Sequence, residues 1–274
     1  MRIVLTGASG VVGGFALHAA RAAGHDVTIL DRRNGYTLGD TPDLSGHHAL
    51  IHCAFSHQPG RYRGGEGDDP EGFRRTNLEG SIRLFDAAAD SGVKRILFLS
   101  SRAVYDGHPP DIELTDDLPA SPANLYGEVK ARAEDHMHSL DLHGTAIRAT
   151  GIYGPGPAHK WRELFTDYLT GKTIAPRVST ELHGDDLAHA MLLLLDQDAP
   201  PPSVNASDLI LDRHDLLAEV QRLTGSDSPL PPRADANALR VMRCDRLAAI
   251  GWRPGGIGML RASLPAMLDP APHL

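Results

Sequence analysis

The sequence predicts an α/β fold built on a doubly wound parallel sheet, with a smaller and less regular lobe at its C-terminal end. Three observations lead to this prediction. Short apolar runs alternate with stretches of helical periodicity up to residue 156. Glycines at every third position, Gly7, Gly10 and Gly13, follow the first of these runs directly. The regular alternation then ends, so we expect a Rossmann-like domain over residues 1–156 and a lobe over residues 157–274 that does not fold independently.

The length and composition fit a globular protein with a full α/β core. The 274 residues carry a formal net charge of −8, which does not suggest a nucleic-acid or anionic-membrane partner. No apolar run reaches the roughly 20 residues of a membrane span, and the chain begins directly in a predicted strand without a signal peptide. We therefore expect a cytoplasmic protein with Cys53 and Cys244 as free thiols. The histidines show no metal-ligand spacing, so we expect no metal site.

The chain opens with a strand, a glycine turn and a helix. Residues 3–5 are an apolar, β-branched run typical of a buried parallel strand, and residues 11–23 are compatible with a helix. Gly7 lets the chain turn, Gly10 lets the backbone approach a pyrophosphate, and Gly13 lets helix and strand pack closely. The expected cofactor contacts here are Gly7, Ser9, Gly10, Val11, Val12 and Gly13. An ordinary glycine-rich βα turn is the alternative.

The second predicted strand, residues 26–30, ends in an acidic residue, Asp31. A carboxylate at this strand tip can accept hydrogen bonds from an adenosine ribose and would repel a 2′-phosphate, which favours NAD over NADP. The following Arg32 and Arg33 leave NADP open, because a guanidinium can bind a 2′-phosphate. Asp31 as a plain turn residue is the alternative.

The remaining elements extend the same alternation. Further strands are expected at residues 36–38, 49–55, 94–99 and 145–149. Because a parallel crossover needs about a dozen residues, either the first of these strands is vestigial or the usual helix before it is missing. Long helices are expected at residues 70–90 and 124–142, and shorter ones at residues 161–168, 185–196, 213–223 and 244–250. Residues 56–69 follow a strand that ends at the ligand-binding edge, so they form either a lid or a plain exposed loop.

Polar side chains gather where the strand at residues 94–99 ends and the helix at residues 124–142 begins. Tyr126 and Lys130 are four residues apart, so both project from one helix face. A lysine ammonium lowers the pKa of a nearby phenol, which makes the tyrosine usable as a general acid or base. A serine hydroxyl from the Ser100–Ser101 pair can orient the same substrate oxygen. This set suits hydride transfer at a secondary alcohol, although a solvated helix face is the alternative for Tyr126 and Lys130 alone.

Several motifs follow one another along nearly the whole chain. They are Thr6-Gly-Ala-Ser-Gly-Val-Val-Gly13, Ile51-His-Cys-Ala54, Asn77-x-x-Gly80, Phe98-Leu-Ser-Ser-Arg-Ala-Val-Tyr105, Tyr126-x-x-x-Lys130, Arg148-x-x-x-x-Tyr-Gly-Pro-Gly156, Asp185-Asp-Leu-Ala188 and Ile250-Gly-Trp-x-Pro254. Together they resemble the extended short-chain dehydrogenases/reductases, the branch that contains nucleotide-sugar epimerases and dehydratases.

The resemblance implies a role for individual residues. Ser101 matches the substrate-orienting serine, Tyr126 the catalytic base and Lys130 its partner. Asp31 matches the ribose acid and Asp40 the adenine-side aspartate. Further cofactor contacts are expected at Arg32, Cys53, Ala54, Asn77 and Leu99. The resemblance also implies NAD as cofactor and a homodimer formed through the helices at residues 70–90 and 124–142.

Three departures from the family pattern bear on the substrate. Arg102 and Ala103 stand where dehydratases of the family carry an Asp-Glu pair, which argues against elimination by that route. Gly151 stands where nucleotide-sugar enzymes usually have an asparagine, and Ser179 where they usually have an arginine. A free sugar, a sugar acid or another small hydroxy compound therefore competes with a nucleotide-sugar as the expected substrate.

Three functions remain open from the sequence. The first is an NAD-dependent oxidoreductase that acts on a secondary alcohol of a sugar-like substrate. The second is an epimerase that uses the same Ser101, Tyr126 and Lys130. The third is a protein that senses NAD(P) without chemistry. Candidate substrate contacts, besides Ser101 and Tyr126, are Arg102, Arg148, His52 and His57; each of these four is alternatively a surface or packing residue.

Overall fold

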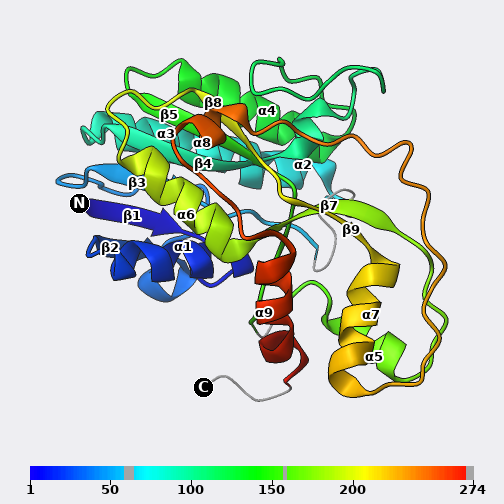
Figure 1. Cartoon of the computed structure of the whole chain (residues 1–274). Coiled ribbons are helices and arrows are strands. Elements are labelled where there is room, and N and C mark those ends of the chain that lie inside the picture. Colours follow the sequence, from blue (N-terminus) through cyan, green and yellow to red (C-terminus); the bar gives the residue numbers. More distant parts are fainter. Residues whose placement is uncertain (59–64, 157–158, 270–274) are drawn as a thin grey trace.

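The structure, a computed structural model, describes residues 1–58, 65–156 and 159–269. Its largest element is a six-stranded sheet in the order β2-β1-β3-β4-β5-β8, in which all neighbours run parallel (Figure 1). The strands are β1 (Arg2–Thr6), β2 (Asp26–Leu30), β3 (Ala49–His52), β4 (Arg95–Ser101), β5 (His143–Ala149) and β8 (Ser203–Ala206). The predicted doubly wound, Rossmann-like sheet is confirmed.

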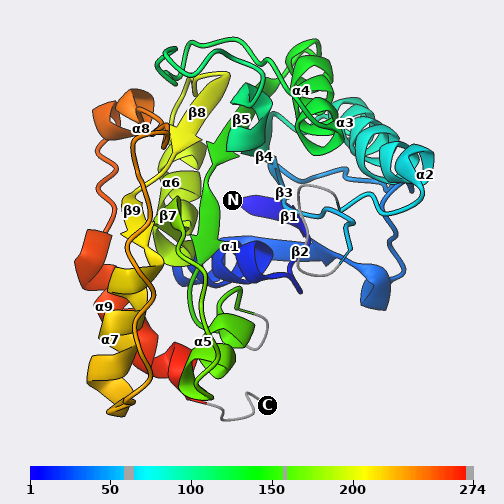
Figure 2. The same ribbon diagram turned by 90° about the vertical axis from the view of Figure 1, so that its right-hand side faces the viewer.

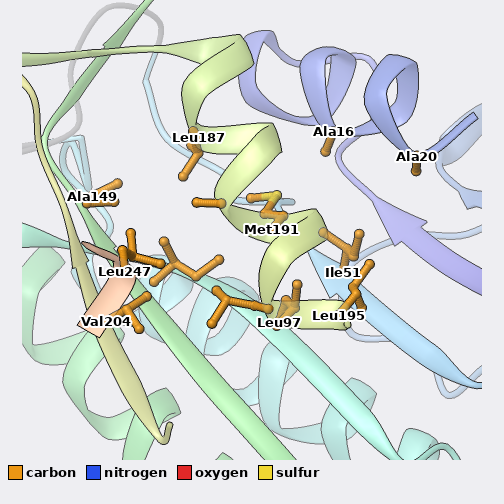
Figure 3. Packing of buried hydrophobic residues seen from close by; sticks show 14 of the residues in the cluster. Ala16, Ala20, Ile51, Leu97, Ala149, Leu187, Met191, Leu195, Val204 and Leu247 are labelled. Carbon is orange, nitrogen blue, oxygen red and sulfur yellow. The ribbon is translucent and has the colours of Figure 1, made fainter. Parts of the chain in front are cut away.

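Helices cover both faces of this sheet, because its inner strands carry runs of apolar residues whose successive side chains point to opposite faces (Figure 2). Ile3 and Leu5 pack toward α1 (Val11–Ala22) and α6 (Gly184–Leu195), whereas Val4 packs toward the opposite face. Figure 3 shows Ala16 and Ala20 of α1 beside Leu187 and Met191 of α6 in the first of these layers. The opposite face is covered by α3 (Gly80–Asp90) and α4 (Leu125–His138).

The helix expected at residues 70–90 is present but contains a π-helical turn. It consists of α2 (Pro70–Arg74), the turn η2 (Arg75–Glu79) and α3 without a break. Asp69 caps the start of α2 by accepting a hydrogen bond from the Gly72 N–H. The other long helix, α4, begins after its cap Asn124 and ends at His138, four residues before the expected end.

The strand expected at residues 36–38 is wrong. Only an isolated bridge between Leu38 and Asp40 is present there. Tyr36 explains the apolar pattern, because its side chain is buried in the cluster beneath α3 while the residues around it are partly or fully exposed. The next strand is also shorter than expected, since β3 ends at His52 and residues 53–58 are irregular.

The part of the chain after residue 149 contains strands that the sequence did not predict. A second sheet is formed by β6 (Gly151–Tyr153), β7 (Val178–His183) and β9 (Leu209–Asp212). A third apolar cluster lies among helices of this region, which both ribbon views place away from the large sheet. These helices are α5 (Arg162–Leu169), α7 (Arg213–Thr224) and α9 (Gly256–Leu268).

The C-terminal residues contribute to both sheets. β8 pairs with β5 in the large sheet, α6 packs against α1, and α8 (Asp245–Ala249) packs near β8. The division of the chain at residue 156 into a Rossmann-like domain and a smaller lobe that does not fold independently stays a prediction. Among the described helices, none is both long enough and apolar enough to cross a membrane.

Candidate functional site

The glycine turn after β1 is too tight for any side chain at two of its positions. A Cβ on Gly7, whose φ is +74°, would lie 2.6 Å from the Ala54 backbone N, and one on Gly13 would lie 2.0 Å from the Gly7 carbonyl oxygen. The Gly10 N–H donates to that same carbonyl at 2.9 Å. The turn therefore brings the start of α1 and the residues after β3 into direct contact, as the roles predicted for Gly7 and Gly13 require.

A cavity of about 440 Å³ opens beside this turn. No side chain of the described residues caps the N-terminus of α1, so its first backbone N–H groups are available to an anion. The cavity is lined by Ala8, Ser9, Gly10, Val11, Gly14, Phe15, His18, Pro155, Gly156 and Asp185. Uncapped amides, missing side chains and an adjacent cavity fit the pyrophosphate of a dinucleotide.

Asp31 caps a short 3-10 helix, η1 (Arg32–Asn34), at the end of β2. Its Oδ1 accepts hydrogen bonds from the backbone N–H groups of Arg33 and Asn34, at 3.0 and 3.1 Å. This geometry agrees with the turn-residue alternative and leaves Oδ2 without a hydrogen bond to a described residue. Asp40 is similarly engaged, since its Oδ2 accepts from the Thr37 N–H at 2.6 Å. Ribose and adenine contacts for Asp31, Arg32 and Asp40 stay predictions.

Lys130 is buried between strand β4 and the start of α4. Its Nζ donates to the Leu99 carbonyl oxygen at 2.7 Å and lies 4.2 Å from the ring centre of Phe55 and 4.7 Å from that of Phe98. The Tyr126 ring centre is 6.0 Å from the same nitrogen. Burial lowers the pKa of Lys130 to about 7. A small change in its surroundings therefore changes the charge of this lysine near neutral pH.

Ser101 and Tyr126 are brought to one edge of the sheet by a close backbone approach. Ser101 ends β4, and its Oγ accepts a hydrogen bond from the Ala103 N–H at 3.2 Å, which starts the 3-10 helix η3 (Arg102–Tyr105). A Cβ on Gly127 would lie 2.5 Å from the Ala103 carbonyl oxygen, so only glycine lets α4 begin here. Sequence reasoning missed Gly127, although a glycine in a first helical turn is itself a signal.

Phe55 is a second residue that the sequence reasoning missed. Its ring packs edge-on against Tyr126, with ring centres 5.2 Å apart, and covers Lys130. Asn77 holds the residue after Phe55, because the Asn77 amide donates to the Ser56 carbonyl at 2.8 Å and accepts from the Ser56 N–H at 2.7 Å. The buried side chain of Asn77, predicted as a cofactor contact, thus uses its hydrogen bonds to hold the loop that carries Phe55.

His52 belongs to a buried chain of hydrogen bonds. The Ser81 hydroxyl donates to the Asn77 carbonyl at 2.6 Å, so it accepts from His52 Nε2, 2.9 Å away. His52 Nδ1 then accepts from the Thr6 hydroxyl at 2.6 Å. Burial lowers the pKa of His52 to about 3, which keeps the ring neutral. His52 is therefore a packing residue, which is the alternative to a substrate contact.

The other candidate substrate contacts have partners within the protein. Arg148 donates to Glu134 Oε2 at 2.7 Å and to the Tyr105 hydroxyl at 2.8 Å; the Arg148 and Glu134 side chains are 8% and 2% exposed. Arg148 thus joins β5 to α4 rather than facing the ligand edge. Arg102 pairs with Asp106 at 3.2 Å. His57 Nδ1 forms a hydrogen bond with the Gln58 carbonyl at 2.7 Å. Residues 59–64, which are part of the predicted lid or exposed loop at residues 56–69, lie outside the described residues.

Both cysteines are free, and burial raises the pKa of each thiol to about 12. Cys53 and Ala54 lie against the glycine turn: their N–H groups donate to the carbonyl and hydroxyl oxygens of Thr6, at 3.3 and 3.2 Å. Within the ranges that the structure describes, no three histidine, cysteine or acidic side chains are grouped as metal ligands.

Comparisons with known proteins agree with this geometry. The family model described as "NAD dependent epimerase/dehydratase family" matches residues 3–207. The UDP-glucose 4-epimerase of Corynebacterium glutamicum is 28% identical over 68% of this chain, but the match spans only 63% of that enzyme. The UDP-glucose 4-epimerase of Lactobacillus helveticus is 28% identical over 93% of this chain and 92% of its own. A 3-diazoavenalumate denitrifying reductase from Streptomyces is 29% identical over 93% and 96%.

Solved structures show the same fold. The UDP-glucose 4-epimerase of Thermotoga maritima, solved with UDP-glucose, superposes with a TM-score of 0.78 at 20% identity and covers 97% of this chain and 98% of its own. The corresponding enzyme of Thermus thermophilus, solved with NAD, gives 0.77 at 22% identity and covers 99% and 100%. At these identities the likeness carries the fold alone. With the family model matched over most of the chain, we conclude that the protein belongs to the NAD-dependent epimerase/dehydratase family, within the extended short-chain dehydrogenases/reductases.

Proposed function

We propose that the protein is an NAD-dependent oxidoreductase that transfers a hydride at a secondary alcohol of a sugar or sugar-like substrate. The observation that carries the proposal is the position of the Lys130 ammonium. It is held on the Leu99 carbonyl, two residues before Ser101, and lies 6.0 Å from the Tyr126 ring centre. A positive charge beside a tyrosine lowers the pKa of its phenol and so supports the use of that tyrosine as a general acid or base.

In this proposal each residue has a separate task. Bound NAD would supply the hydride acceptor. Tyr126 accepts the proton of the substrate hydroxyl during oxidation and returns it during reduction. Ser101 donates a hydrogen bond to the same substrate oxygen and fixes its position. Lys130 stabilises the phenolate and can donate to the nicotinamide ribose, for which it has ammonium protons beyond the one on Leu99.

NAD is the proposed cofactor, and NADP is less favoured. The cradle formed by Gly7, Gly10 and Gly13 fits a pyrophosphate, as the missing side chains and the adjacent cavity indicate. The second carboxylate oxygen of Asp31 supports a ribose contact and disfavours a 2′-phosphate. A cytoplasmic location and a homodimer formed through the helices at residues 70–90 and 124–142 rest on the sequence and its family resemblance alone and stay predictions.

An epimerase is the second candidate, because several relatives are named UDP-glucose 4-epimerase. The same Ser101, Tyr126 and Lys130 would serve both reactions. Gly151 and Ser179 favour the first candidate, since they replace the asparagine and the arginine that the resemblance leads us to expect for a nucleotide-sugar. The intact Tyr126–Lys130 pair argues against the third option, a protein that senses NAD(P) without chemistry.

One experiment separates these candidates. Purified protein is mixed with NAD and, in turn, with free sugars, sugar acids and UDP-sugars, and both the absorbance of reduced cofactor and the sugar products are followed. Reduced cofactor that grows with the oxidised sugar supports the oxidoreductase. A changed sugar without reduced cofactor supports the epimerase. Turnover that survives in Tyr126→Phe contradicts the assignment of Tyr126 in both.

A further inference from the structure

The segment at residues 149–156 connects the end of β5, beside Ser101, with the cavity beside the glycine turn. At one end, Ala149 of β5 pairs in register with Ser101 of β4. At the other end, Pro155 and Gly156 line the cavity beside the glycine turn. A dinucleotide with its pyrophosphate at that turn and its reacting end near Ser101 spans the same two points. Gly151, which is exposed, follows Ala149 by two residues and therefore lies in the half of this segment nearer to Ser101.

An ion pair between Lys160 and Glu181 lies directly next to Gly151. A Cβ on Gly151 would be 2.7 Å from Lys160 Nζ and 2.8 Å from Glu181 Oε2. Glu181 stands opposite Gly151 in the pairing of β6 with β7, and its other carboxylate oxygen accepts from the Ser179 hydroxyl at 2.9 Å. Because residue 151 has no side chain, nothing from that position covers the pair. A glycine inside a strand often marks such a close approach by a ligand.

The pair offers a hydrogen-bond donor and an acceptor side by side. The Lys160 side chain is 28% exposed and that of Glu181 is 5% exposed. Lys160 also lies 5.2 Å from the ring centre of Trp161, which limits its freedom. The Lys160 ammonium has three N–H donors, and within the described residues one of them forms a hydrogen bond with Glu181. The carboxylate likewise has lone pairs beyond those bound by Lys160 and Ser179.

We propose that Lys160 and Glu181 determine substrate specificity by binding two neighbouring hydroxyl groups of a substrate that carries no diphosphate at this position. The proposal rests on the function proposed above. A vicinal diol matches the pair because one hydroxyl oxygen accepts from the ammonium while the other hydroxyl donates to the carboxylate. Because the Glu181 carboxylate already neutralises Lys160, a diphosphate beside the pair would gain little attraction from the ammonium and would be repelled by a nearly buried carboxylate.

The test compares Lys160→Met and Glu181→Gln with the matched control Lys172→Met. Lys172 forms an exposed ion pair with Asp167 in the same region, at 2.6 Å. With the best free sugar of the panel, each of the first two variants should raise KM about tenfold, or about 1.4 kcal/mol, at nearly unchanged kcat. The control should leave KM unchanged, and NAD affinity should be equal in all four proteins. The wild type should prefer the free sugar to its UDP derivative, and Glu181→Gln should reduce that preference.

Gly151→Ala gives an independent variant that keeps both charges. Its methyl group meets the ends of the Lys160 and Glu181 side chains, so it should displace the pair without unfolding the protein and should also raise KM. Unchanged KM in Lys160→Met, Glu181→Gln and Gly151→Ala would overturn the proposal and leave the proposed function intact. If Tyr126→Phe kept turnover while Lys160→Met still raised KM, the catalytic assignment would fail and the specificity pair would stand. If the NAD-loaded wild type neither converted nor bound any free sugar by saturation-transfer NMR, the specificity pair would fail, and the proposed function would fail with it only if no UDP-sugar was oxidised either.

Discussion

Gly127 lies against Ala103 so closely that a Cβ would be 2.5 Å from the Ala103 carbonyl oxygen. Gly127 follows Tyr126 directly, and the Ala103 N–H donates a hydrogen bond to the Ser101 hydroxyl at 3.2 Å. The distance between the two candidate catalytic residues is therefore set by a backbone contact between their neighbours.

Gly127→Ala should reduce turnover far more than it reduces stability. The added methyl group must push the start of α4 away from η3, at a cost of about 1–3 kcal/mol, and this separates Tyr126 from Ser101. We expect kcat to fall at least about tenfold while the protein stays folded, as measured by steady-state kinetics and thermal unfolding. Gly258→Ala is the control, since that glycine is exposed in α9 with open space around it and should gain about 0.5–1 kcal/mol. Equal kcat in the two variants would contradict this role for Gly127.

Lys130→Met should remove turnover and change how stability depends on pH. Burial lowers the pKa of Lys130 from 10.5 to about 7, so between these values the unfolded chain binds a proton that the folded chain does not. The free energy of unfolding of the wild type should therefore rise with pH above about 7, by at most about 1.4 kcal/mol per pH unit, relative to the variant. Urea unfolding at several pH values measures this difference. A difference that stays flat between neutral and alkaline pH would mean that Lys130 remains charged when folded.

Asp31→Asn should weaken the discrimination between NAD and NADP while keeping the helix cap. The asparagine Oδ1 can still accept from the N–H groups of Arg33 and Asn34, but the negative charge near a 2′-phosphate is removed. We expect NADPH affinity to rise about tenfold relative to NADH in fluorescence titrations. Asp31→Ala loses the cap as well, at about 1 kcal/mol of stability. Tighter binding of NADPH than NADH by the wild type would overturn the ribose assignment.

Ser81→Ala should destabilise the protein because it leaves a buried donor without an acceptor. The His52 ring is neutral and donates from Nε2 to the Ser81 hydroxyl at 2.9 Å, and His52 is fully buried. Removing that hydroxyl should cost about 1–3 kcal/mol in urea unfolding. Ser139→Ala, which removes an exposed hydroxyl bonded to the His136 carbonyl, should cost much less. Similar losses in both variants would argue against the hydrogen-bond chain described for His52.

The parts of the fold predicted correctly are those whose signals lie close together in the sequence. The glycine turn, the tip of β2 and the helix that carries Tyr126 and Lys130 are each encoded within a few consecutive residues. The strands β6 to β9 escaped prediction because they are three to six residues long and depend on distant partners, as Gly151 does on Glu181. Periodicity cannot identify such strands.

The candidate site was predicted in part for the same reason. The sequence places Arg148 and His52 near the ends of strands, where ligands bind, but it does not show what lies across from them. Only the folded chain brings Glu134 to Arg148 and Ser81 to His52. Phe55 was taken as the end of a strand, and its contact with Lys130 depends on a loop held by Asn77, 22 residues further along.

The return of the chain to the large sheet at β8 has a consequence for truncated forms of the protein. β5 is an inner strand only because Ala146 to Ala149 pair with Ser203 to Ala206. A fragment that stopped at residue 156 would present the backbone N–H and C=O groups of β5 as an open, apolar edge. Such an edge can recruit strands from other molecules, so the fragment should self-associate, whereas the full chain supplies its own covering strand.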